Sequence, residues 1–488
     1  MDNYIITLPP PCTNSDLHMG HLTGVYILGD IYARYQALNG SNITTICGAD
    51  QNNTYTEKKA ELTQMTFEDA GELYASKILD SLNLANVKCD TYVRTSSAEH
   101  INTVKEIIDI LIDNGTLIEK DVQQIYCENC NEFICDTRIG GICANCGYGC
   151  DGGICENCST PTFNLKLLQP SHKTCSTASI LKTTKALVLN LSKVKNGLFE
   201  LIEASSWDNR LKCKYLEYLS REESEEIIVS CNYDKGIKVV VDSGNIYSIA
   251  IWFEAIWSLF TGLKLAGKKN LTEIIKFLTE TNSNIVVFMG QDTEFYYALS
   301  VSAILLGLGT NNIIHKMSIQ RFIKLSGKKF SSSRGHTIFL EELSKKYHID
   351  VIRLYSIAVI EPYFANNSDF SVDDLDALNL KVNTFKNKLL DIKVGFIEGS
   401  HLHELLQLQK QLNHYKIAMA NLDYTQVFKI VSNLIDQIIA INASELSSLN
   451  LAMIFFMLKP IMPTFVDEIS AKLHFLHWET LNVGTPKE

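Results

Sequence analysis

The 488-residue sequence has no apolar run long enough to cross a membrane. Its longest apolar stretches, 249–256 and 303–308, fall far short of the ~20 residues that a transmembrane helix needs. Residues 1–11 carry no basic start ahead of a long apolar segment, as a secretion signal would. We therefore expect a soluble, cytoplasmic protein that does not partner a membrane.

The sequence also lacks a basic excess. It has 44 Lys and Arg against 55 Asp and Glu, a formal net charge of −11. Proteins that coat nucleic acids non-specifically normally carry the opposite balance, because they neutralise phosphates. The charge balance therefore excludes a protein that coats nucleic acids non-specifically, although a local basic face is compatible with the composition. With 46% hydrophobic residues, the chain is expected to form about two to four domains.

Cysteines are concentrated in one segment, where eight of the 14 lie between Cys127 and Cys158. Such a density predicts disulfides in a small secreted domain, but a metal site in a cytoplasmic chain of this length. Two pairs, Cys143-x2-Cys146 and Cys155-x2-Cys158, are separated by a glycine-rich stretch. Paired thiolates on tight turns can wrap a tetrahedral Zn²⁺, so we expect zinc here rather than free thiols.

A third pair, Cys127-x2-Cys130, predicts a second metal site, and Cys135 and Cys150 are its candidate partners. A closed shell of four protein ligands leaves no open position for a substrate, so any zinc is expected to be structural. The sequence leaves open whether the chain holds one zinc ion or two.

Hydrophobic periodicity predicts an α/β fold that is interrupted and then resumed. Strands are expected at 4–7 and 43–47, on either side of a helix over 18–38 that ends at Asn39-Gly40. Helices are also expected near 66–85 and 98–114, and after the cysteine-rich segment the pattern returns with a buried strand at 285–289 and a helix at 293–306. From residue 371 onward the periodicity is almost wholly helical.

The fold class that follows is a split, doubly wound parallel sheet of the Rossmann-like kind. Residues 1–115 and 246–370 are expected to form its two halves, 116–245 an inserted connective domain with the zinc knuckles, and 371–488 a C-terminal helical bundle.

Two motifs carry the chemistry. His18-Met19-Gly20-His21 lies where the first strand's loop meets a helix, whose N-terminus and imidazoles suit phosphate. Lys329 to Gly335 offers one ammonium and the hydroxyls of Ser331 and Ser333, which suit the charge that builds on a triphosphate. Taken singly, the first could be a metal pair or a histidine-capped helix, and the second an exposed serine-rich turn.

Together the motifs resemble the two signatures of the class I aminoacyl-tRNA synthetases, His-x-Gly-His and Lys-Met-Ser-Lys-Ser. The resemblance covers roughly residues 4–390, and the knuckles point to the methionyl-tRNA synthetase branch. It implies a ligase of protein biosynthesis that uses ATP and Mg²⁺ to form an aminoacyl-adenylate and passes the amino acid to tRNA.

The same resemblance implies roles for single residues. His18 and His21 would contact the phosphates, Lys329 the departing pyrophosphate, and Asp50 the substrate's α-amino group. Gly20, Ser331 and Ser333 would belong to the ATP site, Gly290 and Asp292 would hold the adenosine, and Trp252 would wall the amino-acid pocket. A turn or cap remains an alternative for Asp50, and a core position for Trp252.

Several positions depart from the family pattern. The pocket positions occupied in that family by leucine, two tyrosines and histidine are Pro10, Cys12, Leu259 and Tyr297 here, and the second signature's second lysine is Ser332. No tryptophan lies between Ser371 and Ser470, where the family stacks one on the anticodon. The pocket contacts set which amino-acid side chain is accepted, and a stacked tryptophan strengthens binding to a base.

Three functions therefore stay open. The first is a methionyl-type enzyme, and the second a diverged paralogue that activates another small or apolar amino acid and passes it to a carrier, a peptide or a small molecule without reading an anticodon. The third is a non-catalytic regulatory or binding protein on the same scaffold. The sequence does not settle whether the chain is a monomer or a homodimer.

Overall fold

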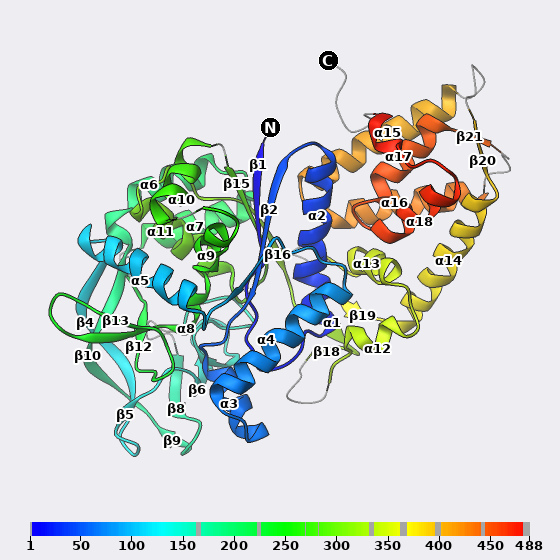
Figure 1. The fold of residues 1–488 in the computed structure, drawn as a ribbon. Helices are drawn as coiled ribbons and strands as arrows, with labels where there is room; N and C mark the ends of the chain where they lie inside the picture. The colour runs from blue at the N-terminus through cyan, green and yellow to red at the C-terminus, as the bar shows by residue number, and fades with distance from the viewer. Residues whose placement is uncertain are drawn as a thin grey trace.

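A five-stranded parallel sheet forms the centre of the molecule (Figure 1). The computed structural model describes residues 2–162, 167–221, 226–268, 270–281, 283–330, 336–361, 368–395, 402–440 and 445–481. The strand order is β16-β15-β1-β2-β3. The strands are β1 (Asn3–Thr7), β2 (Asn42–Ala49), β3 (Thr91–Arg94), β15 (Ser283–Gly290) and β16 (Ile314–Gln320).

The two halves of the sheet come from distant parts of the chain. On one side β1 pairs in parallel with β2, and on the other with β15, in the register Ile5↔Ile285. The predicted split, doubly wound sheet is therefore confirmed.

Both faces of the sheet are buried, which explains the continuous apolar run in β15. Val286 and Phe288 pack into a core shared with α2 and the C-terminal helices. Ile285, Val287 and Met289 point into a second core shared with α5, α9 and α10. Successive side chains of a strand alternate between faces, so a strand covered by helices on both sides needs apolar residues throughout.

The first crossover is helical as predicted, from α1 (Met19–His21) through a π-helical turn η1 (Leu22–Tyr26) to α2 (Ile27–Leu38). Asn39 caps its end, and Gly40 has φ +81°, a conformation that favours glycine. The predicted helices α4 (Phe67–Leu84) and α5 (Ala98–Asp113) are confirmed. A helix that was not predicted, α3 (Thr54–Thr63), precedes them. It buries only Thr54, Thr56 and Ala60, so it shows no apolar stripe.

Between the sheet halves the chain forms a β-rich insertion, in the lower left of Figure 1. The long strands β4 (Leu117–Cys127) and β10 (Ile180–Asn190) pair antiparallel, flanked by β5 (Glu132–Phe133) and β11 (Glu226–Ile228). The remaining elements are β6 (Asp136–Cys143), β7 (Gly149–Gly152), β8 (Leu167–His172), β9 (Thr177–Ala178), η2 (Leu191–Lys193), α6 (Lys195–Ala204), α7 (Asn209–Ser220), β12 (Ser230–Cys231), β13 (Lys238–Val240) and β14 (Ile246–Ile249).

Short helices then lead back into the sheet and toward the C-terminal part. They are α8 (Ile251–Ala255), α9 (Ser258–Leu265), α10 (Leu271–Glu280), η4 (Tyr296–Val301), α11 (Ser302–Gly307), α12 (Leu340–Ser344) and α13 (Ile349–Ala358). A small sheet of β17 (Lys324–Leu325), β18 (Lys328–Lys329) and β19 (Asp369–Phe370) lies among the last of these.

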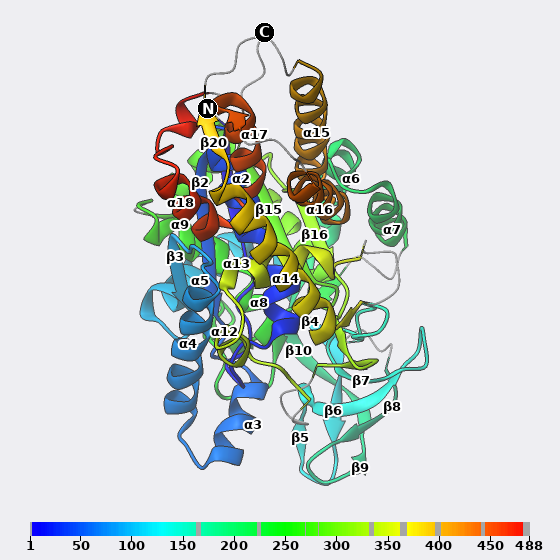
Figure 2. The same cartoon turned by 90° about the vertical axis from the view of Figure 1, so that its right-hand side faces the viewer.

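The C-terminal part is a helical bundle, as predicted, seen on the right in Figure 1 and facing the viewer in Figure 2. Its helices are α14 (Val372–Leu390), α15 (Leu402–Ala420), α16 (Tyr424–Ala440), α17 (Ser448–Leu458) and α18 (Pro463–Lys472), followed by the turn η6 (Trp478–Leu481). Two short parallel strands, β20 (Lys393–Gly395) and β21 (Glu445–Ser447), were not expected from its helical periodicity.

In the described ranges, no helix has the length and apolarity that a membrane crossing requires.

Arg353 of α13 fastens this bundle to the sheet. Its guanidinium is fully buried and pairs with Asp30 of α2 at 2.6 Å. It also donates to the carbonyl oxygens of Ala85, Asn86, Pro460 and Ile461, at 2.9–3.2 Å. One side chain therefore joins α2, the end of α4 and the α17–α18 turn.

Replacing Arg353 by Met should lower the free energy of unfolding by about 3–5 kcal/mol, because four carbonyl oxygens lose this donor and Asp30 keeps only Arg34, among the described residues, as a cationic partner. Urea denaturation followed by circular dichroism measures the change. The exposed pair Arg221–Glu217 supplies the control, since Arg221→Met should cost no more than about 0.5 kcal/mol. Equal effects of the two substitutions would contradict the importance of the buried pair.

Candidate functional site

Phe330, which lies in the described part of the second signature, packs against the first signature. The His18 ring stacks on the Phe330 ring, with centroids 5.2 Å apart, and on the His21 ring at 3.8 Å. Beside them, the Met19 amide donates to the carbonyl oxygen of Ile338 at 3.0 Å. The start of α1 and the chain that follows β17 therefore form one wall of a common site.

Gly20 and Lys329 lie at this contact. A side chain at Gly20 would meet His18 at 3.0 Å and Phe330 at 3.3 Å, so the close packing favours glycine. Lys329 belongs to β18, but its side chain is outside what the structure describes, as are Ser331 and Ser333.

Asp50 follows the carboxyl end of β2 and is held by its backbone. Its amide donates to the carbonyl oxygen of Pro11 at 2.9 Å, and its carbonyl accepts from the Thr13 amide at 3.0 Å. The side chain is 3% exposed, and its Oδ1 has no hydrogen-bond partner among the described residues. Burial, and then the negative charge of Glu254, raise the pKa of Asp50 well above its usual range. A buried carboxylate with an open oxygen can accept a cationic donor.

Cys12 lies next to Asp50, to whose Oδ2 its thiol donates at 3.7 Å. Burial, followed by the charges of Asp50, Asp136 and Asp292, raises the pKa of the Cys12 thiol well above its ordinary value. Asp50 thus contacts this thiol, and the charges of Asp136 and Asp292 act on it from two other parts of the chain.

Asp136 was not predicted as a site residue. It begins β6 in the inserted domain, far in sequence from both signatures, and no motif marked it. Thr54 Oγ1 of α3 donates to its Oδ2 at 2.6 Å. Burial raises the pKa of Asp136 to about 6.

The remaining predicted residues gather at the same edge of the sheet. Pro10 follows β1 and lies beside Gly48 of β2, at whose position a side chain would come within 3.4 Å of the proline. Gly290 ends β15, and a side chain there would come within 2.4 Å of Asp292 Oδ1. Because the carboxyl ends of parallel strands meet at one edge, this is where such folds bind ligands.

Aromatic side chains form the wall beside these carboxylates. The Trp252 ring stacks on the Tyr296 ring at 3.8 Å and 12°. Tyr297 and Leu259 are almost completely buried, and Asp50 adds to the effect of burial in raising the pKa of Tyr297. The wall is apolar, with its polar groups near Asp50.

Two groups of side chains in the insertion could each hold a metal ion. Cys143, Cys146, Cys155 and Cys158 form the first, with their ligand atoms within 4.8 Å of one another, as predicted. The second group unites the predicted Cys127 and Cys130 with His172 and Cys175.

The expectation that Cys135 and Cys150 complete the second group is wrong. The Cys135 thiol points to the carbonyl oxygen of Asn232 at 3.9 Å, and Cys150 lies in β7 opposite Gly141. The strand β8 carries His172 to the Cys127 turn instead. The sequence signal for this ligand pair was the spacing of His172 and Cys175, which have two residues between them.

The insertion is anchored directly to the site. The Ser159 hydroxyl, next to the ligand Cys158, donates to the carbonyl oxygen of Gln291 at 2.7 Å. On the other side, Arg138 donates to both carboxylate oxygens of Glu57 in α3 at 3.0 Å. The folded insertion therefore touches both the Gly290–Asp292 segment and the helix that follows Asp50.

A disulfide between Cys47 and Cys89 joins β2 to the segment before β3, with Cα atoms 5.8 Å apart. Sequence reasoning missed it, because the cysteines are separated by 42 positions and neither belongs to the cysteine-rich cluster.

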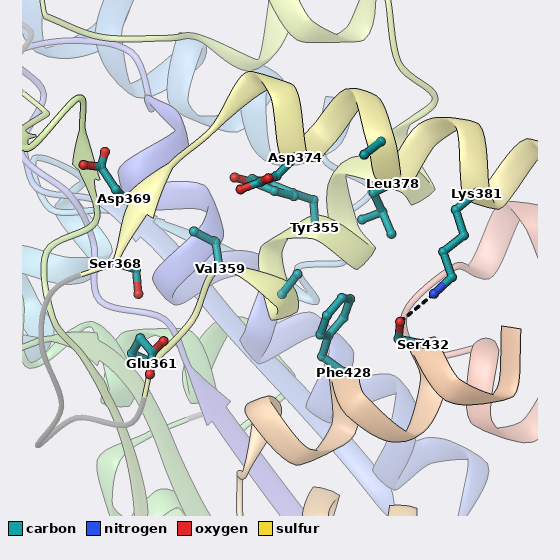
Figure 3. A pocket seen from close by; sticks show the side chains of 12 residues that line it. Tyr355, Val359, Glu361, Ser368, Asp369, Asp374, Leu378, Lys381, Phe428 and Ser432 are labelled. Atoms are coloured by element: carbon teal, nitrogen blue, oxygen red, sulfur yellow. Dashed lines mark hydrogen bonds between the residues drawn. The ribbon is translucent and has the colours of Figure 1, made fainter. Parts of the chain in front are cut away.

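A separate cavity of about 760 Å³ lies between α13, α14 and α16 (Figure 3). Tyr355 and Phe428 contribute aromatic walls, and Lys381 donates to Ser432 at 2.8 Å on one side. None of the predicted site residues lines it, so it is distinct from the site at the sheet edge.

The raised pKa of Asp136 predicts a stability change with pH. Because the folded-state pKa of about 6 exceeds the ordinary 3.8, ionisation disfavours the folded state, and stability is lost as the pH rises through this window. Asp136→Asn removes this cost while keeping an acceptor for Thr54. It should stabilise the protein by up to about 3 kcal/mol near pH 7.5, and by about half as much near pH 5.

Urea denaturation at the two pH values measures this difference. The exposed Asp242 provides the matched control, and its change to Asn should alter stability equally at both. A gain for Asp136→Asn that is the same at the two pH values would contradict the buried, ionised carboxylate.

Comparison with known proteins places this site in a family. The chain is 28% identical over 405 residues to a methionine–tRNA ligase of Methanocaldococcus jannaschii, covering 83% of this chain and 59% of that ligase. It is 29% identical over 397 residues to the corresponding ligase of Methanococcus vannielii, covering 80% and 57%. The chain thus spans less than two thirds of the length of these relatives.

A solved structure shares the fold. The methionyl-tRNA synthetase of Mycobacterium tuberculosis, bound by methionyl-adenylate, aligns with a TM-score of 0.71 at 12% identity, over 98% of this chain and 97% of that one. The family profile described as "tRNA synthetases class I (M)" matches residues 4–392. The chain therefore belongs to the class I tRNA synthetases of the M group.

Proposed function

We propose that this protein activates methionine with ATP, forming methionyl-adenylate, and transfers the methionyl group to tRNA. The observation that carries the proposal is the packing of His18 against Phe330 at the sheet edge that also carries Asp50. This packing supports the proposal, because it brings the described part of the second signature to the first. The relatives are named as ligases of methionine and tRNA, which favours this function over a diverged paralogue or a non-catalytic scaffold.

Within this proposal the site residues have distinct tasks. Asp50 receives the α-ammonium of the amino acid through its open Oδ1. His18 and His21 contact phosphate oxygens at the N-terminus of α1, where free amides also favour anions. Gly290 allows close approach of the adenosine, and Asp292 binds its ribose. Lys329, with Ser331 and Ser333, stabilises the pyrophosphate as it leaves.

The pocket supports an apolar amino-acid side chain. Trp252, Tyr296 and Leu259 provide aromatic and aliphatic contact, and methionine is flexible and polarizable enough to pack on aromatic faces. Pro10 and Cys12 stand where the family places larger groups, so this pocket is shaped differently around the same kind of ligand.

ATP is expected to bind with Mg²⁺, which supplies charge neutralisation on the phosphates. We propose Zn²⁺ as the metal of both cysteine groups, because four thiolates, or three thiolates and one imidazole, suit its tetrahedral geometry. Its role is structural, since the ligand shells are closed. The insertion that the zinc holds then supports the Gly290–Asp292 segment through Ser159.

We further propose three functional parts made of four segments, with the catalytic core in 1–115 and 246–370, the zinc-bearing insertion in 116–245, and the bundle of 371–488 facing the tRNA. Since the bundle carries no tryptophan before Trp478, anticodon contact there would use other side chains.

Methionine-dependent exchange of pyrophosphate into ATP tests the activity. The wild-type protein should exchange with methionine and not with the other standard amino acids. Asp50→Asn keeps size but removes the charge that faces the ammonium, so it should raise KM for methionine about 10- to 100-fold and change KM for ATP little.

Charging of bulk tRNA with radiolabelled methionine tests the second step. Lys316→Met alters a lysine away from the proposed site, whose Nζ donates to the Ala420 carbonyl, and it should keep exchange near the wild-type rate. Exchange with another amino acid, or none with any, would overturn the proposal.

Elemental analysis of purified protein tests the metal assignment. The wild type should contain about two zinc ions per chain, and His172→Ala and Cys146→Ser should each contain about one. Cys213→Ser alters an exposed free thiol and should keep about two. Zinc loss on replacing Cys135 or Cys150, with no loss on replacing His172, would contradict the second ligand set.

A further inference from the structure

A buried pair of a carboxyl group and an imidazole contacts the loop that carries Asp50, and the proposed reaction gives this pair no role. It consists of Glu254 of α8 and His100 of α5, both with fully buried side chains. The imidazole Nε2 lies 3.2 Å from Glu254 Oε2, an ion-pair distance. Thr261 of α9 fixes the other ring nitrogen, with its Oγ1 2.9 Å from Nδ1.

The second oxygen of Glu254 faces the Asp50 loop. Glu254 Oε1 accepts from the Asn52 side-chain amide at 3.0 Å, and the same amide donates to the Thr95 carbonyl oxygen at 2.9 Å. Asn52 is therefore held between α8 and the end of β3. Since Asn52 stands two residues after Asp50, its position constrains the backbone that carries the open carboxylate oxygen.

Neighbouring bonds complete this loop. The Gln51 amide donates to Thr95 Oγ1 at 2.8 Å, and the Asn53 side chain donates to the Asp50 carbonyl oxygen at 2.7 Å. Thr95 therefore holds the Asp50 loop at the end of β3, and Glu254 holds the same loop from α8. Glu254 also stands two residues after Trp252, so one short helix carries both the pocket wall and the anchor.

Burying the Glu254 carboxyl group costs free energy, which indicates that the group has a function. A carboxyl group in the interior loses its hydration, whereas an apolar residue of the same size would pack without that cost. Asn52 donates to its Oε1, and the His100 ring lies 3.2 Å from its Oε2, although neither Oε2 nor His100 Nε2 makes a hydrogen bond among the described residues. The negative charge of Glu254 also acts on Asp50, whose pKa it raises.

We infer that Glu254 is a positioning residue for amino-acid binding: through Asn52 it fixes the Asp50 loop so that Asp50 Oδ1 meets the substrate's ammonium. The inference rests on the proposed function, because it takes an amino acid as the ligand. It predicts that Glu254 affects the affinity for the amino acid and not the affinity for ATP.

The experiment measures equilibrium binding of methionine and, separately, of ATP by isothermal titration calorimetry of the full chain. Glu254→Met keeps the size of the side chain and removes the acceptor and the charge, whereas Glu254→Gln keeps an acceptor for Asn52. We expect Glu254→Met to weaken methionine binding about tenfold or more and to leave ATP binding within about twofold. Glu254→Gln should lie between wild type and Glu254→Met.

A double-mutant cycle separates positioning from general loss of structure. Asn52→Ala should weaken methionine binding about as much as Glu254→Met. The double variant should bind methionine no more weakly than whichever single variant binds it less well, because each substitution removes the same contact between Asn52 and Glu254. Glu294→Gln is the control for a buried carboxylate, since Glu294 bonds to Lys214 and Tyr215 of α7 instead. It should leave methionine affinity within about twofold.

Additive effects of Asn52→Ala and Glu254→Met, or equal loss of methionine and ATP affinity, would overturn the inference. So would methionine binding by Glu254→Met within about twofold of wild type. The binding measurement does not depend on pyrophosphate exchange. A wild-type protein that binds methionine but exchanges no pyrophosphate into ATP would therefore overturn the proposed activity and not the inference about Glu254. A wild type that binds no methionine overturns both.

Discussion

β1 and β15 pair edge to edge from Asn3↔Ser283 to Thr7↔Val287, although the chain between them folds a whole β-rich insertion. This pairing holds the two halves of the sheet in one register. It places the loop after β1 beside the end of β15, while β2 brings Asp50 to the same edge from the other side. If the register shifted by one residue, Ile285 and Val286 would exchange faces, and both cores would lose their packing. The site therefore exists because the two apolar cores fix this register.

The buried pair of Arg353 and Asp30 extends the same constraint to the helical bundle. Asp30 lies on α2, whose N-terminal end follows the His18 segment. A bundle that moved relative to α2 would take the Pro460 and Ile461 carbonyl oxygens away from the buried Arg353 guanidinium, which Asp30 holds at α2. The bundle and the His18 segment consequently share one rigid support. Whatever the bundle contacts in solution is held at a fixed distance from the sheet edge.

Sequence reasoning predicted the split sheet, the first crossover and one complete metal group, because each has a local pattern. It did not predict α3, whose polar residues carry no apolar stripe, or the disulfide of Cys47, whose partner is far away in sequence. Asp136 and Glu254 were missed for a different reason. Each gains its place only from tertiary contacts, with Thr54 in one case and with His100 and Asn52 in the other. No spacing along the chain reports such contacts.

The charges around Cys12 show what kind of ligand the site suits. Asp50, Asp136 and Asp292 act together on its thiol, and burial keeps that thiol protonated by raising its pKa. A protonated thiol is a donor and not a nucleophile, so Cys12 can support Asp50 but is unsuited to covalent catalysis. Burial also raises the pKa of Asp50 and of Asp136, so a cation close to these carboxyl groups would favour their ionised forms. Under the proposed function, the ammonium group of the amino acid is that cation, and the aromatic wall receives its side chain.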